Sequence, residues 1–406
     1  MSRAPVAVLA AWLLSQAGAS AQSAPPPATR AEALEAQRAA RELTPGVDRQ
    51  TWLERALFFV EEKRVFQRLN PPEGFYPRFG SIVNGSGFGV GGGYRRRPAR
   101  GRVLLDASGA WTLRDFRTAQ GRVALRPAGR PVELSAGSVW YDYPQGVFIG
   151  LGPASARVDR VTYSLEGLDT YAQVQAQKAR RFVASGRVGL HRMTAGPGTD
   201  ARFPSLEDRF TDVTAPGLRD PLTLTYAQAS AGVDTRDQPR NTRGGGLYHA
   251  SLGVFRGRNG DNVNFNRVDV TALQVIPIFD KKRGVALRAT ATRIDPVGQS
   301  RVPFFLMTTV GGGNSVRGFE EFRFRDAAAV TVNAEYRWEA FSGLDLALFV
   351  DAGNVGPTWR SIMGADLKTS WGGGFRFNTN RRVMLRIDLA SGSEGTRIWA
   401  RLGPVF

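Results

Sequence analysis

From about residue 79 to the end of the chain, apolar and polar residues alternate with a period of two. In VTVNAEYRWE, residues 330–339, the apolar set is Val330, Val332, Ala334, Tyr336 and Trp338, and every residue between them is polar or charged. VALRATAT (285–292) and VMLRIDL (383–389) follow the same period of two, apart from the apolar Ala286 and Met384 on the second face. Because successive side chains of a strand point to opposite faces, the pattern predicts β-strands with one apolar and one polar face. A soluble sandwich and a transmembrane barrel both produce this pattern.

Three features favour the transmembrane antiparallel barrel. The alternating segments have about 9 to 12 residues, the length of a tilted membrane-spanning strand, whereas soluble strands cluster near 5 or 6. Aromatic residues such as Trp111, Trp371 and Trp399 lie toward strand ends, which suits interfacial girdles. Short connections, such as 340–343, alternate with long ones, such as 295–327.

The pattern gives sixteen candidate strands, although counts down to twelve remain open. They lie near 78–84, 87–96, 101–112, 115–126, 132–143, 157–177, 181–192, 223–234, 245–256, 266–276, 284–293, 328–338, 344–352, 368–377, 383–391 and 396–406. Asn84-Gly85 is a hairpin signal between the first two strands. An even count places both ends of the barrel on the periplasmic side.

The residues before the barrel predict an exported protein. Residues 1–21 combine a basic start, a short apolar run and the Ala19-Ser20-Ala21 site, as a secretory signal peptide does. Residues 22–47 are predicted to be a flexible linker with a helix-prone stretch, and residues 48–70 an amphipathic helix. We expect the barrel to occupy 78–406, since no later segment has the roughly 18 consecutive apolar residues of a transmembrane helix.

The net charge and the distribution of the arginines indicate which classes of binding partner to expect. The formal charge is +18, but the arginines are spread along the chain and no nucleic-acid motif is present, so we expect no nucleic-acid partner. Outer-membrane lipids and lipopolysaccharide suit the basic excess better.

Catalytic signatures are weak. His191 and His249 lie on different predicted strands, and the sequence has no cysteine, nucleophile elbow or phosphate loop. We therefore expect no cofactor, no metal site and no enzymatic activity; an outer-membrane lipase is the enzyme alternative.

An ordered set of motifs then resembles a known family. VRGF (316–319) lies in a long loop, and AEYR (334–337), FVDAGNV (349–355), WGGGFRF (371–377) and a terminal Phe406 follow it. The order resembles the C-terminal barrel of the BamA/TamA superfamily of outer-membrane assembly and translocation proteins, also called the bacterial surface antigen family. The resemblance covers about residues 77–406.

The resemblance implies specific roles. In the loop motif Val316, Arg317, Gly318 and Phe319, the arginine inserts into the barrel and pairs with carboxylates of the two following strands, here Glu335 and Asp351. The alternation places both carboxylates on the polar face. Phe406 resembles the insertion signal that the barrel assembly machinery reads during biogenesis.

The chain departs from the family before the barrel. About 57 residues, 22–78, precede it after the signal peptide, too few for a periplasmic polypeptide-transport domain with its linker. The expectation is therefore a short member of the bacterial outer membrane that assists insertion or translocation of proteins or lipids. The alternative is a passive pore or structural barrel without assembly activity. The sequence identifies no protein client.

Overall fold

The computed structural model describes residues 70–404, except 180, 219–220, 259–261, 279–280, 342 and 380–381. The predicted signal peptide, the linker, the helix at 48–70 up to residue 69, and Phe406 lie outside these residues.

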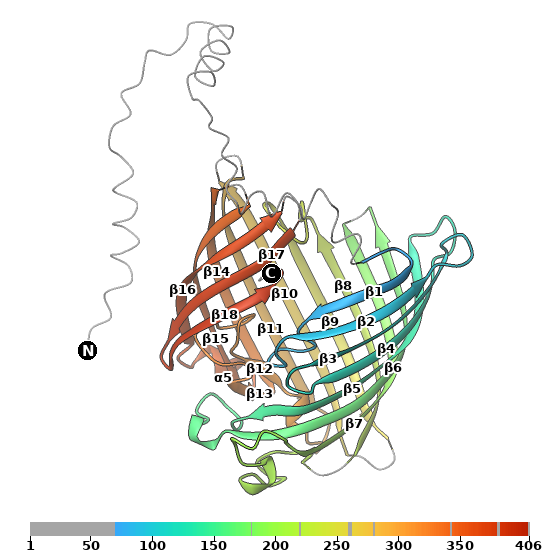
Figure 1. The fold of residues 1–406 in the computed structure, drawn as a ribbon. Coiled ribbons are helices and arrows are strands. Elements are labelled where there is room, and N and C mark those ends of the chain that lie inside the picture. The colour runs from blue at the N-terminus through green and yellow to red at the C-terminus, as the bar shows by residue number, and fades with distance from the viewer. Residues whose placement is uncertain are drawn as a thin grey trace, which may run out of the picture. The chain divides into compact units, whose positions relative to one another are not determined.

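The described chain forms one sixteen-stranded antiparallel sheet that curves into a barrel (Figure 1). Its strands, in spatial and chain order, are β1 (Gly74–Gly80), β2 (Gly89–Arg96), β3 (Val103–Thr112), β4 (Arg117–Leu125), β5 (Val132–Phe148), β6 (Val161–Lys178), β7 (Phe182–Pro197), β8 (Leu222–Asp234), β9 (Gly245–Gly257), β10 (Asn264–Ile278), β11 (Arg283–Pro296), β14 (Ala328–Phe341), β15 (Leu344–Gly356), β16 (Lys368–Thr379), β17 (Arg382–Gly392) and β18 (Gly395–Leu402). Two short strands, β12 (Thr308–Val310) and β13 (Phe324–Asp326), form a separate pair within one loop. The sixteen-stranded barrel predicted from the sequence is confirmed.

Burial distinguishes the barrel from a sandwich. On β14, Val332 is 47 % exposed, whereas its neighbour Asn333 is 1 % exposed. On β15, Leu348 and Val350 are exposed, and the residue after Val350, Asp351, is buried. The apolar face therefore points outward and the polar face inward, as a lipid-exposed barrel requires.

The two ends of the barrel differ. We call the end that carries the connections 81–88, 113–116, 149–160, 198–221, 258–263, 297–327, 357–367 and 393–394 the loop end. The other, the turn end, carries 97–102, 126–131, 179–181, 235–244, 279–282, 342–343 and 380–381. Both ends of the described chain adjoin the turn end, which is uppermost in Figure 1. The alternation of long and short connections follows the sequence prediction.

The loop end is filled by its own hydrophobic core. Phe148, Val161, Leu206, Leu218 and Phe304 pack together there, although they come from four separate segments. Short helices accompany these loops: η1 (Arg157–Asp159), η2 (Leu206–Asp208), η3 (Phe304–Leu306) and α5 (Trp359–Met363). None of the helices in the described residues is long and apolar enough to cross a membrane.

The first strand differs from its prediction. β1 runs from Gly74 to Gly80, four residues earlier than the predicted 78–84. Asn84-Gly85 does not form a two-residue hairpin but lies within the eight-residue connection 81–88, where Ser86 Oγ accepts hydrogen bonds from the backbone N of Ile82 and Val83. This side-chain bond holds a wider turn than the Asn-Gly pair would form alone.

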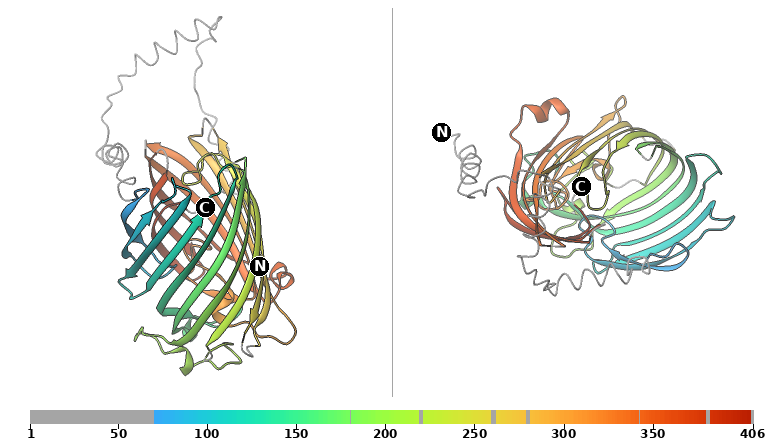
Figure 2. Two further views of the ribbon diagram at one scale, coloured as in Figure 1. Left: turned by 90° about the vertical axis from the view of Figure 1, so that its right-hand side faces the viewer. Right: turned by 90° about the horizontal axis from the view of Figure 1, so that it is seen from above.

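The sheet ends at β1 and β18, which face each other at the front of Figure 1. Within the described residues, no ladder of backbone hydrogen bonds joins them. Seen from above, the remaining strands follow one another around a ring (Figure 2). We call the boundary between β1 and β18 the seam.

Candidate functional site

The loop 297–327 folds against the interior face of β14–β17. Its residues Val310, Val316, Phe319 and Phe324 pack with Val355 of β15 in a buried cluster. Gly318 lies directly on the wall: a Cβ added there would come 2.6 Å from Ser370 Cβ and 2.9 Å from Gly392 Cα. Only glycine permits this close approach.

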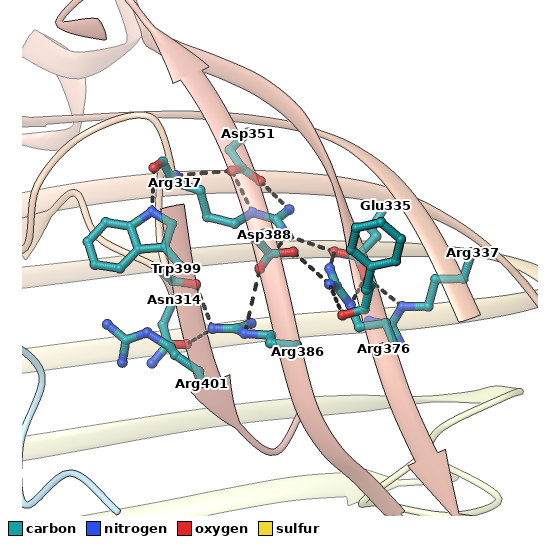
Figure 3. Close-up of polar contacts among 12 residues, drawn as sticks. Asn314, Arg317, Glu335, Arg337, Asp351, Arg376, Arg386, Asp388, Trp399 and Arg401 are labelled. Atoms are coloured by element: carbon teal, nitrogen blue, oxygen red, sulfur yellow. Dashed lines mark hydrogen bonds and ion pairs between the residues drawn. The ribbon is translucent and has the colours of Figure 1, made fainter. Parts of the chain in front are cut away.

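Arg317 forms both of the ion pairs expected from the sequence. Its Nη1 donates to Glu335 Oε2 at 2.7 Å, and its Nε and Nη2 donate to the two oxygens of Asp351 at 2.9 and 2.8 Å (Figure 3). The backbone N of Arg317 also donates to Asp351 Oδ2 at 3.1 Å. The guanidinium thus binds Asp351 in bidentate fashion and bridges two adjacent strands. We call Arg317 with Glu335 and Asp351 the latch.

The charge cluster extends beyond the latch: Arg337 Nε donates to Glu335 Oε1 at 2.7 Å, Arg386 Nε lies 3.6 Å from Asp388 Oδ2, and two more residues, Arg376 and Asp388, connect these pairs. Arg376 of β16 donates to Glu335 Oε2 at 3.0 Å and lies 2.6 Å from Asp388 Oδ1. Asp388 of β17 lies 3.7 Å from Arg317 Nη1. Sequence reasoning did not assign these two residues to the site, although the alternation of VMLRIDL had placed Asp388 on the polar face. What it lacked was the register that brings four strands to one point.

The latch is dry. Arg317, Glu335 and Asp351 are all fully buried. Burial by itself lowers the pKa of Arg317, but the hydrogen bond to Asp351 and the charges of Glu335, Asp351 and Asp388 outweigh it, so the pKa is raised above its ordinary value. The guanidinium therefore stays charged, and loss of either carboxylate leaves this buried charge less well compensated.

Aromatic side chains hold Arg317 from two sides. The guanidinium carbon lies 3.3 Å from the ring centroid of Phe349, a cation–π contact. The indole Nε1 of Trp399, on β18, donates to the carbonyl oxygen of Arg317 at 2.7 Å. Trp399 therefore faces the interior, and its prediction as a girdle residue was wrong, because its N–H is used within the barrel. Trp111 and Trp371 are exposed on the outer face.

The charged residues after the motif fix the loop to other parts of the barrel. Glu321 pairs with Arg401 of β18, and Arg323 Nε donates to Glu394 Oε1 at 2.7 Å. Arg325 Nη1 donates to the carbonyl oxygen of Phe304 within the same loop at 2.9 Å, and its backbone carbonyl accepts from the backbone N of Gly152, in the connection 149–160, at 2.8 Å. Burial raises the pKa of Glu321 even though Arg401 lowers it. These contacts attach the loop 297–327 to other connections of the loop end and to β18, in addition to the wall formed by β14–β17.

One junction bridges the seam. Asn84, in the connection that follows β1, accepts from Arg401 Nη1 of β18 at 3.1 Å and from Asn314 Nδ2 of the loop at 3.3 Å. These side-chain contacts therefore connect the two sides of the seam, where no ladder of backbone hydrogen bonds joins β1 to β18 within the described residues.

The turn end is also crossed by a connection. Arg243, in the segment 235–244 between β8 and β9, pairs through both Nη atoms with Asp345 of β15 at 2.9 and 3.0 Å. The backbone N of Val383 on β17 donates to the carbonyl oxygen of Arg240 at 2.9 Å. This segment thus reaches strands that are not its neighbours in the sheet.

The histidines show no catalytic or metal-binding arrangement within the described chain. His191 Nε2 shares a hydrogen bond with Tyr141 Oη at 2.9 Å. Across the described ranges, no group of three His, Cys, Asp or Glu side chains could hold a metal ion.

Comparisons with known proteins agree with this geometry. The Omp85 superfamily domain matches residues 172–395, more than half of the chain. The fold is similar to BamA from Haemophilus ducreyi lacking POTRA domains 1–3, with a TM-score of 0.61 and 13 % identity over 82 % of this chain and 69 % of that one. It is also similar to CdiB from Escherichia coli, with a TM-score of 0.52 and 14 % identity over 81 % of this chain and 62 % of that one. No curated protein matches.

Proposed function

The chain belongs to the Omp85 superfamily, and from that premise we propose that it is a bacterial outer-membrane barrel that assists insertion or translocation of other proteins, or of lipids, by opening at the seam. The observation that carries the proposal is the missing ladder between β1 and β18 among the described residues. An unpaired edge can accept a strand from another chain.

The strands next to the seam are short and β2 is rich in glycine, so separating β1 from β18 should require little free energy. β1 has 7 residues and β18 has 8, whereas β5 has 17 and β6 has 18. Half of the eight residues in β2, GVGGGYRR, are glycines, which lose packing and conformational entropy in a strand. Pro77 within β1 is compatible with an edge strand.

The latch and its neighbours connect β18, on one side of the seam, to the interior wall of the barrel. Arg317 ties the loop to β14 and β15, and Trp399 and Arg401 tie the same loop to β18. On this account the loop holds β18 to β14 and β15, and the seam separates where Asn84 meets Arg401 and Asn314.

Reconstitution tests the proposed activity. Vesicles that contain the full chain are compared with empty vesicles for the rate at which a urea-unfolded eight-stranded outer-membrane barrel inserts, and for transbilayer movement of a fluorescent phospholipid. We expect at least one rate to rise in the presence of the protein. Equal rates for both probes in both vesicle types would contradict the proposal.

The passive pore is the alternative. Sixteen strands can enclose an aqueous channel, but the loop 297–327 and the segment 235–244 both cross the interior.

We also propose that the barrel is not an enzyme, that lipopolysaccharide contacts its outer face, and that the assembly machinery inserts it during biogenesis.

A further inference from the structure

The connections at the two ends of the barrel carry very different charge. The seven connections of the turn end contain thirteen Lys or Arg residues and two acids, whereas the eight connections of the loop end contain twelve Lys or Arg residues and thirteen acids. The basic excess of the whole chain is therefore concentrated at one end. Charge balance at the loop end leaves no comparable surface there.

Further cations, in the strands next to these connections, lie on the lipid-facing side of the strand ends. Arg96 follows Tyr94 by two residues on β2 and shares its outer face. Lys178, at the end of β6, is directly opposite Phe182 of β7. Arg283, at the start of β11, is directly opposite Trp338 of β14.

The aromatic neighbours mark an interfacial girdle. Tyr94 is 44 % exposed and Phe182 is 55 % exposed on the outer face. Aromatic residues in this position lie at the level of the lipid headgroups. Lys and Arg just beyond them can keep their stems against the apolar surface and extend their charges to the phosphate layer.

Some cations of the turn end pair with carboxylates, as Arg126 does with Glu133 and Lys281 with Asp237, but acids are too few there to match them all. In the part of the chain that the structure describes, no ion pair involves Arg96, Lys178 or Arg181, and all three are exposed. At the loop end, Arg117 pairs with Asp115 at 2.8 Å and Arg202 pairs with Asp200 at 2.7 Å. What distinguishes the two ends is the net charge of their connections, since the turn end has thirteen Lys or Arg residues but only two acids.

We propose that the turn end is a binding rim for the phosphates of anionic phospholipids, such as phosphatidylglycerol, in the leaflet that this end contacts. Charge complementarity and the position beside the aromatic girdle select a lipid headgroup as occupant. The rim places the barrel at a defined depth and gathers anionic lipid around the seam strands, whose chain ends adjoin the same end. The inference does not depend on whether the barrel inserts other proteins.

Native mass spectrometry of the folded full chain tests the rim. Protein in detergent micelles is titrated with phosphatidylglycerol or with phosphatidylcholine, and bound lipids are counted. We expect the wild type to prefer phosphatidylglycerol. The triple variant R96Q/K178Q/R181Q should lose that preference, by roughly fivefold in affinity for each cation that contacts a headgroup.

Two further variants control for the location of the substitutions and for misfolding. R258Q/R301Q/R360Q removes three exposed arginines at the loop end and should leave the preference unchanged. R96K/K178R/R181K keeps every charge and should bind like the wild type, which separates charge from misfolding.

Equal phosphatidylglycerol binding by the wild type and R96Q/K178Q/R181Q overturns the proposal, as does an equal loss in the loop-end variant. A lipid A arm is included, and a preference for lipid A over phosphatidylglycerol that depends on the same three residues would also overturn it. So would an absence of lipid preference combined with binding of polyglutamate that the triple variant abolishes, because the rim would then recognise a polypeptide.

Discussion

The indole N–H of Trp399, on the last strand, donates to the carbonyl oxygen of Arg317 at 2.7 Å, while the guanidinium of Arg317 binds Asp351 on β15. One loop residue thus joins a seam strand to the interior wall of the barrel.

Replacing Arg317 should destabilise the barrel more than any loop arginine at the surface. R317A leaves Asp351 buried without its bidentate cation, while Glu335 keeps Arg337 and Arg376, and we expect a loss of about 3 to 5 kcal/mol of unfolding free energy. R317K should recover only part of it, because an ammonium cannot reproduce the bidentate geometry. Urea unfolding in vesicles measures both, with the exposed Arg301 as the control position in R301A. Equal stability of R317A and R301A would exclude the latch as a stabilising element.

Gly318 should not tolerate a methyl group. In G318A the new Cβ meets Ser370 Cβ and the backbone of Gly392, so the loop must move off the wall, at a cost of about 1 to 3 kcal/mol. G364A is the matched control, since a Cβ at Gly364 meets nothing within 4 Å. Limited proteolysis should cut the loop faster in G318A than in G364A; the same protection in both would show that the contact is not close.

The hydrogen bond from Trp399 can be removed with little change of shape. W399F keeps an aromatic ring but leaves the carbonyl of Arg317 without this donor, and we expect a loss of about 1 to 2 kcal/mol. Trp371 is 68 % exposed on the outer face, so W371F should change stability far less. A larger effect of W371F than of W399F in the same unfolding assay would place the important tryptophan on the lipid side.

The segment 235–244 should restrict conductance through the barrel. R243Q removes the pairing with the buried Asp345, which frees this segment from β15, and planar-bilayer recordings should then show larger or more frequent openings than the wild type. R240Q is the control, because Arg240 contacts β17 through its backbone carbonyl. A large steady conductance in the wild type, unchanged in R243Q, would favour the passive pore.

Much of the fold follows from the alternation because a strand buried on one side must repeat every two residues. The pattern could not give the length of β5, which continues to Phe148 past the predicted end at residue 143. There the loop-end core buries residues such as Phe148, and the contrast between the two faces is lost. β12 and β13 were missed for a related reason, since three-residue strands are too short to show a period.

The site was predictable where it depended on faces and unpredictable where it depended on register. Glu335 and Asp351 could be placed on the polar face, and both contact Arg317. The approach of Arg376 and Asp388 to the same point requires the alignment of β16 and β17, including a register shift after Phe377, which no single strand records. Trp399 alternates with the exposed Ile398, so its inward face follows from the period of two, whereas its hydrogen bond to Arg317 depends on the loop.

Cross-linking the seam tests the central claim most directly. The chain has no cysteine, so F79C/L402C introduces a single pair on the outer faces of β1 and β18, where Gly80 lies close to Leu402. A short bis-maleimide joins the pair. In L389C/I398C, a disulfide joins β17 and β18, which are already paired.

If the seam must open, the cross-linked F79C/L402C protein should lose the insertion or lipid-transfer rate that the unlinked variant shows in vesicles, while L389C/I398C keeps it after oxidation. Full activity of the cross-linked seam would contradict the account.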